Sequence, residues 1–387
     1  MKKAPSDYMP QLDSLRALAV FAVMIHHWLP GFLGFGPWGD LGVRCFFVLS
    51  GFLITGILLR ARTAVESGRT SVGWQMRQFY IRRSLRIFPI YYLTLLVGAF
   101  LGMHVLRETF WWHACYGSNF YFALRGNWHG YVSHLWSLSV EEQFYLLWPA
   151  LILLLPRRIL PGIFGACIAG AVLTRAGLAA ALGPEHIALK VLLPSCLDSL
   201  VTGALLSWFF TAKPSLGSTA NVWSRRGFAA TTVLFLALRV VEHVGIGKTL
   251  VAVLGPLVDA VLFAGIIGKC AQGISGPLGR IMDLGPLQYF GRISYGLYLY
   301  HMFAAYVAGM FANKFGLTVP GPGFVQFALF FTMSVTAAAL SQKFIERPFN
   351  NLKRFFPAEV DRRKVKSEPG DLVPAGETHQ AALGNRS

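Results

Sequence analysis

Residues 12–29, LDSLRALAVFAVMIHHWL, form an apolar segment long enough to cross a lipid bilayer, yet this segment carries Arg16 and His27. A charged group at the bilayer centre costs about 2.5–3.5 kcal/mol on insertion scales, so such residues face a protein interior or a watery cavity and are candidates for function. Their eleven-residue spacing corresponds on an α-helix to three turns plus about 20°, with about 16 Å of rise. The two side chains therefore share one face, as two points on a polar path through the protein.

The apolar character of this segment extends along most of the chain. Of the 387 residues, 54% are hydrophobic and 14% are charged, and the mean hydropathy is +0.51, whereas ordinary soluble domains contain about 25% charged residues. Stretches of about 17–25 apolar residues can each span the hydrocarbon layer. The sequence predicts an all-α, polytopic membrane bundle with ten spans, at about 12–29, 41–59, 87–105, 136–155, 160–182, 195–211, 227–243, 249–268, 287–311 and 321–342.

The distribution of Lys and Arg predicts the orientation of this bundle. An even number of spans places both termini on one side, and the basic residues are concentrated in the loops of that side, among them Lys2, Lys3, Arg157 and Arg158. By the positive-inside rule, both termini are cytoplasmic. The net charge of +17 is then mainly a signal of topology, with the lipid bilayer as the partner, and we expect no binding of nucleic acid.

The chain divides into two regions of unequal size. We expect residues 1–345 to form one membrane domain and residues 346–387 to form a basic, disordered cytoplasmic tail, because the tail mixes charged residues with Pro and Gly without apolar periodicity. Residues 60–86 are expected to form a basic cytoplasmic loop, and residues 106–135 an outer loop rich in aromatic side chains. The five cysteines are scattered, which predicts neither a disulfide framework nor a metal site.

His27 is the first candidate for chemistry. Histidine is the side chain best suited to proton transfer near neutral pH. Adjacent residues point about 100° apart on a helix, so His27, and not His26, shares the face of Arg16. The structural alternative is an interfacial histidine bonded to a backbone carbonyl.

The basic stretch RRSLR supplies the next candidates, Arg82, Arg83 and Arg86. Arg83 and Arg86 are three residues apart and so are neighbours on one helical face. Two guanidinium groups in that position can clamp a phosphate or diphosphate. A positive-inside anchor would require the same residues, so this alternative stays open.

The segment HLWSLSVEEQFYLLWP places Glu141 and Glu142 near the start of the fourth span. Carboxylates so close to hydrocarbon usually pair with a cation or a histidine. Acidic residues near a helix start also stabilise its N-terminus. One glutamate can fill that role while its neighbour faces the interior of the bundle.

The ninth span contains GRISYGLYLYH, in which Ser294 and His301 lie seven residues apart and within about 20° of each other on a helix. Tyr298 adds to the polarity of this segment. Trp136 ends the aromatic outer loop, whose rings can stack on sugars. The alternatives are polar packing between helices for the first three residues and an interfacial aromatic belt for the tryptophan.

Six segments in this order resemble the membrane-bound acyltransferase 3 family, which includes O-acetyltransferases of bacterial surface polysaccharides and Nod factors. They are LDSLRALAVFAVMIHH, LGVRCFFVLSGFLIT, RRSLRIFPIYY, HLWSLSVEEQFYLLWP, ISYGLYLYH and IERPF. The match covers most of residues 8–349, with these segments in order. The resemblance implies a ten-span protein of the bacterial cytoplasmic membrane. Such a protein moves an acyl group, usually acetyl, from cytoplasmic acyl-CoA to a hydroxyl of a sugar or glycan, with no permanently bound cofactor.

The resemblance also implies roles for particular residues. His27 matches the essential histidine of the family, Arg16 its paired basic residue, and Arg83 with Arg86 its RxxR pair. We therefore expect His27 to be the base that takes the proton of the acceptor hydroxyl, with Glu141 or Glu142 orienting it. A covalent acyl-histidine is an open alternative.

The remaining candidates bind the two substrates on this interpretation. We expect the nucleotide end of acetyl-CoA to bind four arginines, Arg16, Arg82, Arg83 and Arg86. The acceptor would contact Trp136, Ser294, Tyr298 and His301. The acceptor's identity, the acyl chain length and the oligomeric state do not follow from the sequence.

Two other classes of protein fit parts of the pattern. The first is a secondary transporter of an anionic solute whose pathway is formed by Arg16, Arg44, Arg175, Arg239 and Arg292. The second is a non-catalytic membrane partner of a glycan assembly complex. Consumption of acetyl-CoA without transport would exclude the first of these, and an inert purified protein would favour the second.

Overall fold

Each of the ten predicted apolar segments corresponds to a long helix in the computed structural model, which describes residues 8–32, 36–212 and 227–357. No strand occurs within those ranges, so the all-α prediction is confirmed there. The long helices are α1 (Pro10–Trp28), α2 (Trp38–Glu66), α3 (Val72–Phe100), α7 (Leu135–Leu154), α8 (Leu160–Leu182), α10 (Leu193–Ala212), α12 (Phe228–His243), α13 (Lys248–Gln272), α16 (Ser294–Lys314) and α17 (Phe324–Ser341).

Short helices fill several of the connections. The predicted outer loop at 106–135 is largely helical, because it contains most of α4 (His104–Glu108) as well as three other helices. The short elements are α4, α5 (Phe110–Ala114), α6 (Ser118–Arg125), η1 (Gly130–Val132), η2 (Arg157–Ile159), α9 (Ala188–Val191), α14 (Gly276–Met282), α15 (Gly285–Arg292), the π-helical η5 (Gln342–Glu346), α18 (Arg347–Asn351) and η6 (Leu352–Phe355).

Five described helical segments are long and apolar enough to cross a membrane: Trp38–Glu66, Arg157–Leu182, Ala188–Thr211, Lys248–Gln272 and Phe324–Phe355. The chain is therefore a multi-pass membrane protein. Helices α1 and α3 are also long, but they carry charged and polar residues that lower their hydropathy. The total of ten spans and the cytoplasmic position of the termini stay predictions.

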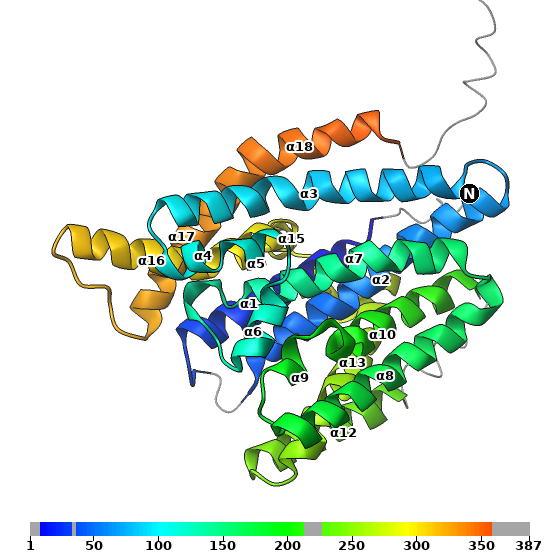
Figure 1. Ribbon diagram of the computed structural model, residues 1–387, viewed down its shortest axis with the longest axis horizontal. Coiled ribbons are helices and arrows are strands. Elements are labelled where there is room, and N and C mark those ends of the chain that lie inside the picture. Colours follow the sequence, from blue (N-terminus) through cyan, green and yellow to red (C-terminus); the bar gives the residue numbers. More distant parts are fainter. Residues whose placement is uncertain (1–7, 33–35, 213–226, 358–387) are drawn as a thin grey trace, which may run out of the picture.

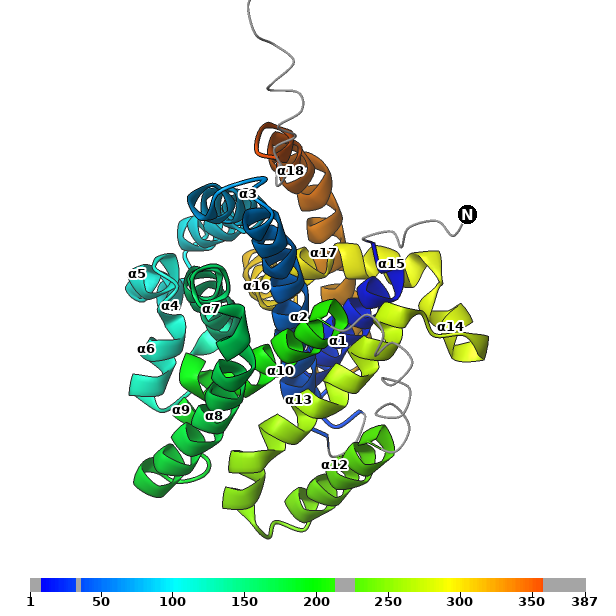
Figure 2. The ribbon, with the colours of Figure 1, turned by 90° about the vertical axis from the view of Figure 1, so that its right-hand side faces the viewer.

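The helices form two groups joined along α1, α2 and α7. Helix α2 packs against α1, α7, α10 and α13, and α10 and α13 also pack against α8. Figures 1 and 2 show α8, α10 and α13 in the lower part of the molecule and α3 and α18 at the top. Helix α16 contacts α1, α3 and α17. The residues that sequence analysis selected on α1, α3, α7 and α16 thus lie where the two groups meet.

Glycines allow α2 to approach its neighbours closely. A Cβ atom at Gly51 would lie 1.7 Å from the Leu200 carbonyl oxygen of α10, and one at Gly203 of α10 would lie 2.0 Å from the Val48 carbonyl oxygen. Small residues permit this backbone contact between membrane helices. The segment LGVRCFFVLSGFLIT therefore fixes the centre of the fold.

Two predicted boundaries differ from the structure. Helix α2 continues to Glu66 and α3 begins at Val72, so residues 60–86 are mostly helical and the predicted third span, 87–105, begins too late. Ser71 caps α3 by accepting a 3.2 Å hydrogen bond from the Trp74 amide. The predicted tail also begins too early, because helical structure continues from residue 346 to Phe355. Residues 358–387 lie outside the described part of the chain.

Candidate active site

Helix α1 carries Arg16 and His27 on one continuous helix, as the sequence predicts. Arg16 Nη1 lies 2.7 Å from Asp13 Oδ1, one turn earlier on the same helix. The other oxygen of this carboxylate accepts a 2.8 Å hydrogen bond from the Tyr8 hydroxyl. The charge of Arg16 is therefore balanced within α1, and the guanidinium side chain keeps 22% of its surface exposed.

The His27 ring lies between α1 and α16. Its Nδ1 is 2.9 Å from the Val23 carbonyl oxygen and 3.3 Å from His301 Nε2. A carbonyl oxygen can only accept a hydrogen bond, so the contact with Val23 assigns the proton of the neutral ring to Nδ1. His27 Nε2 is then the unprotonated nitrogen, and His27 is exposed. This arrangement leaves a basic nitrogen that can take a proton from a substrate.

Sequence analysis did not select His134, although it begins the segment HLWSLSVEEQFYLLWP. This residue directly precedes α7, is 4% exposed and has its ring centroid 4.9 Å from that of His301. Its Nε2 lies 3.1 Å from the Leu299 carbonyl oxygen, 165 residues away in the chain. Only the tertiary structure brings His27, His134 and His301 together.

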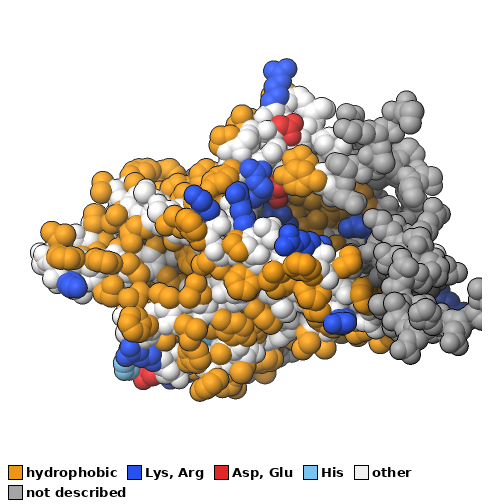
Figure 3. All heavy atoms as spheres, turned by 90° about the horizontal axis from the view of Figure 1, so that it is seen from above, with side chains coloured by type: hydrophobic (Ala, Val, Ile, Leu, Met, Phe, Trp, Pro, Cys, Tyr) orange, Lys and Arg blue, Asp and Glu red, His pale blue; other side chains and the backbone are white. Residues whose placement is uncertain are grey.

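An arginine cluster, which we define as Arg16, Arg83 and Arg86, combines one residue of α1 with two residues of α3, which packs against α7. The Arg83 guanidinium lies 5.2 Å from the centroid of the Tyr145 ring, and Arg86 interacts electrostatically with both other arginines. Arg86 is exposed. Figure 3 shows a largely hydrophobic face of the protein on which Lys and Arg side chains gather toward the centre and right.

Arg82 points away from this cluster, although it was predicted with the same group. Its Nη1 donates hydrogen bonds of 3.2 Å to the Lys353 carbonyl oxygen and 3.0 Å to the Phe356 carbonyl oxygen. Arg82 therefore attaches the chain beyond α18 to α3.

The two glutamates face the arginine cluster. The Glu141 carboxylate interacts with the Ser50 hydroxyl and with all three arginines of the cluster. Glu142 interacts with Glu141 and Arg83. We expected a glutamate to orient His27, but the contacts at Nδ1 of that ring come from Val23 and His301 instead. Both carboxyl groups thus lie within electrostatic range of the arginine cluster.

The four residues predicted to contact the acceptor are all buried. Trp136 packs edge-on against Phe47, with the ring centroids 5.8 Å apart, and Ser294 begins α16. The Tyr298 hydroxyl lies 2.6 Å from Ser137 Oγ and donates a 3.1 Å hydrogen bond to the His134 carbonyl oxygen. Glu141 also interacts with Tyr298. Tyr298 therefore connects the arginine cluster with the histidines.

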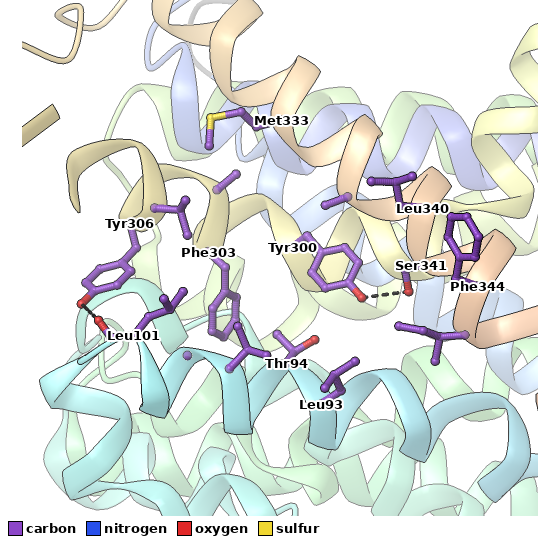
Figure 4. Close-up of a pocket in the computed structure, with 16 residues that line it drawn as sticks. Leu93, Thr94, Leu101, Tyr300, Phe303, Tyr306, Met333, Leu340, Ser341 and Phe344 are labelled. Atoms are coloured by element: carbon purple, nitrogen blue, oxygen red, sulfur yellow. Dashed lines mark hydrogen bonds between the residues drawn. The ribbon is translucent and has the colours of Figure 1, made fainter. Parts of the chain in front are cut away.

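A separate groove of about 480 Å³ lies between α3, α16 and α17. Leu93, Phe303, Met333 and Leu340 are among its largely apolar lining, and Figure 4 shows the Tyr300 hydroxyl bonded to Ser341 at its edge. The distance of that bond is 2.9 Å. The lining contains no charged residue and no histidine, so the candidate base and the arginine cluster lie outside this groove.

The arginines of the alternative transport pathway are held by separate partners. Arg175 pairs with Asp198 at 2.6 Å, and neither side chain is exposed. Arg239 Nη1 lies 2.7 Å from Glu242, and Arg44 donates to Ser199 Oγ at 3.2 Å. These contacts give the arginines roles in packing and do not favour transport.

A helical membrane bundle in which one helix carries both an available base and, about 16 Å along its axis, a residue of an arginine cluster has the parts of a membrane-embedded group-transfer enzyme. A sequence profile described as an acyltransferase domain matches residues 9–342. The chain belongs to the membrane-bound acyltransferase 3 family.

The names of two relatives agree with this assignment. The chain is 29% identical over 332 residues to the peptidoglycan O-acetyltransferase OatA of Listeria monocytogenes, covering 76% of this chain and 49% of the relative. It is 27% identical over 403 residues to the O-acetyltransferase OatA of Staphylococcus aureus, covering 93% of this chain and 60% of the relative. The chain thus spans only about half to three fifths of these relatives. No solved structure matches it.

Proposed function

We propose that this protein is an acyl-CoA-dependent O-acyltransferase that transfers an acetyl group to a hydroxyl of a cell-envelope glycan. The observation that carries the proposal is the His27 ring, whose Nδ1 contacts Val23 and His301 while Nε2 has no hydrogen bond to any residue that the structure describes. The names of the relatives add peptidoglycan as a candidate acceptor. The family and the basic loops are consistent with a bacterial cytoplasmic membrane.

The reaction requires a base and a binding site for anionic phosphates. The acceptor hydroxyl attacks the thioester carbonyl carbon while His27 Nε2 takes its proton, because a neutral alcohol is a weak nucleophile. The C–S bond then breaks, and the CoA thiolate receives the proton from His27. Arg16, Arg83 and Arg86 hold the CoA phosphates by charge-assisted hydrogen bonds.

The role of the predicted acceptor-contacting residues changes in this proposal. Because Trp136, Ser294 and Tyr298 are buried, we assign them to support of the site. The exposed aromatic residues of the outer segment, such as Trp111 and Trp128, are better placed to contact a sugar.

The test uses the purified chain in proteoliposomes with radiolabelled acetyl-CoA and soluble peptidoglycan fragments. General-base catalysis contributes about 10²- to 10⁴-fold, so His27→Ala is expected to lower the rate of acetyl transfer by that factor. The matched control is His26→Ala, which alters the adjacent exposed histidine and should retain activity. Equal rates for wild type and His27→Ala would contradict the proposal, as would solute uptake without consumption of acetyl-CoA.

A further inference from the structure

His301 is placed so that it can determine which nitrogen of His27 carries the proton. Its Nδ1 lies 2.6 Å from the Tyr298 carbonyl oxygen, which can only accept a hydrogen bond. The Nδ1 of neutral His301 is therefore protonated, and its Nε2 is an acceptor. That acceptor lies 3.3 Å from Nδ1 of His27.

We propose that His301 is a positioning residue, which accepts the Nδ1 proton of His27 in a hydrogen bond and so keeps Nε2 of His27 free to act as the base. This inference rests on the proposed function. It replaces the predicted role of His301 in binding the acceptor, because the side chain is fully buried and has no surface to offer a sugar.

His301 Nε2 matters as a second acceptor because the Val23 carbonyl oxygen already accepts a hydrogen bond within helix α1. The amide of residue 27 bonds to the carbonyl of residue 23 in a regular α-helix, so this oxygen is shared between the amide and the imidazole. His301, on a different helix, gives Nδ1 a further partner and fixes the plane of the ring. When Nε2 takes a proton, the imidazolium keeps its Nδ1–H bond to His301, so no further proton movement is required.

His134 and Tyr298 hold His301 rigidly. The His134 ring lies at 70° to the His301 ring, and its Nε2–H donates to the Leu299 carbonyl of α16. The Tyr298 hydroxyl donates in turn to the His134 carbonyl. Two hydrogen bonds therefore join the start of α7 to residues 298–301 of α16, one donated from each segment. These bonds restrict the motion that would separate His301 from His27.

The test compares two substitutions of His301, one that keeps a hydrogen-bond acceptor for His27 Nδ1 and one that removes it. A glutamine amide oxygen reaches about as far as Nε2 of histidine, so His301→Gln keeps an acceptor for His27 Nδ1, whereas His301→Leu removes it. Misplacing a catalytic group by about 1 Å can cost about 10²-fold. We expect His301→Leu to lower kcat by about 10- to 100-fold with the KM values within about twofold, and His301→Gln to recover most of the rate.

Equal kcat values for wild type and His301→Leu would overturn the inference, and so would equal losses in both variants when their unfolding temperatures match wild type. Activity of His27→Ala at the wild-type level would instead refute the proposed function itself. If neither variant of His301 folds, 15N spectra of histidine-labelled wild-type protein decide the matter. A His27 ring protonated at Nε2 would overturn the inference, and protonation at Nδ1 would support it.

Discussion

Substitution of Gly51 by alanine should push helices α2 and α10 apart and thereby lower both stability and activity. A Cβ at this position would lie 1.7 Å from the Leu200 carbonyl oxygen, roughly half the distance at which such atoms attract each other. The obstacle is a backbone atom, so no side chain can rotate away to relieve it. Helices α2 and α10 would have to move apart by roughly 1.5 Å to restore an ordinary contact.

Overpacking of this kind costs about 1–3 kcal/mol. Because only backbone displacement can relieve the contact, we expect Gly51→Ala to lie at the upper end, about 3 kcal/mol, which lowers the ratio of folded to unfolded protein by about a hundredfold. Activity should fall as well, because the adjacent Ser50 bonds to the Tyr145 hydroxyl and to Glu141.

The assay is equilibrium unfolding of the purified protein in detergent micelles, combined with acetyl transfer at a temperature where both variants are folded. The matched control is Gly170→Ala on α8, where an added Cβ would have no neighbour within 4 Å. This control should gain up to about 1 kcal/mol from helix propensity. If Gly51→Ala unfolds like the control, α2 and α10 do not make the close contact from which the prediction is derived.

Three further predictions concern substrate charge, buried charge and pH. Arg86→Gln should raise the KM for acetyl-CoA, with little change for a short acetyl thioester that lacks phosphates; equal increases for both donors would argue against phosphate binding. Arg175→Met should destabilise the protein by about 3–5 kcal/mol, because it leaves the buried Asp198 carboxylate unpaired, and adding Asp198→Asn should restore part of the loss in the same unfolding assay. Burial lowers the pKa of His113, outside the predicted spans, to about 4, so between pH 6.5 and 4 the unfolded state binds a proton that the folded state does not. Stability should therefore fall as pH decreases through this range, and His113→Phe should reduce that slope in unfolding measurements.

Apolar segments could be predicted from the sequence because burial in lipid demands long stretches of the same residue types. Where arginines interrupt such a stretch, as in α3, the helix begins earlier than hydropathy indicates. Arg82 and Arg83 are accommodated by carbonyl oxygens and an aromatic ring from other elements. Those partners lie far away in the chain, so a local pattern cannot include them.

The same limit applies to the candidate site. The common face of Arg16 and His27 follows from helix periodicity, because both lie on α1. The contact of His27 with His301 joins residues 274 positions apart, and the proximity of Glu141 to arginines of α1 and α3 depends on the packing of these helices. The sequence thus indicated which polar side chains lie within the apolar helices, but the contact of His27 with His301 became evident only in the tertiary structure.

The separation of His27 and His301 also affects how the enzyme matures. The two rings are 274 residues apart, and bacterial ribosomes and their eukaryotic counterparts add about 5–20 residues per second. A nascent chain therefore holds its first helix for roughly 15–55 s before the ring that completes the pair has been synthesised. During that interval the contact between the two rings cannot form, so the site is assembled only after α16 has been synthesised and has packed against α1.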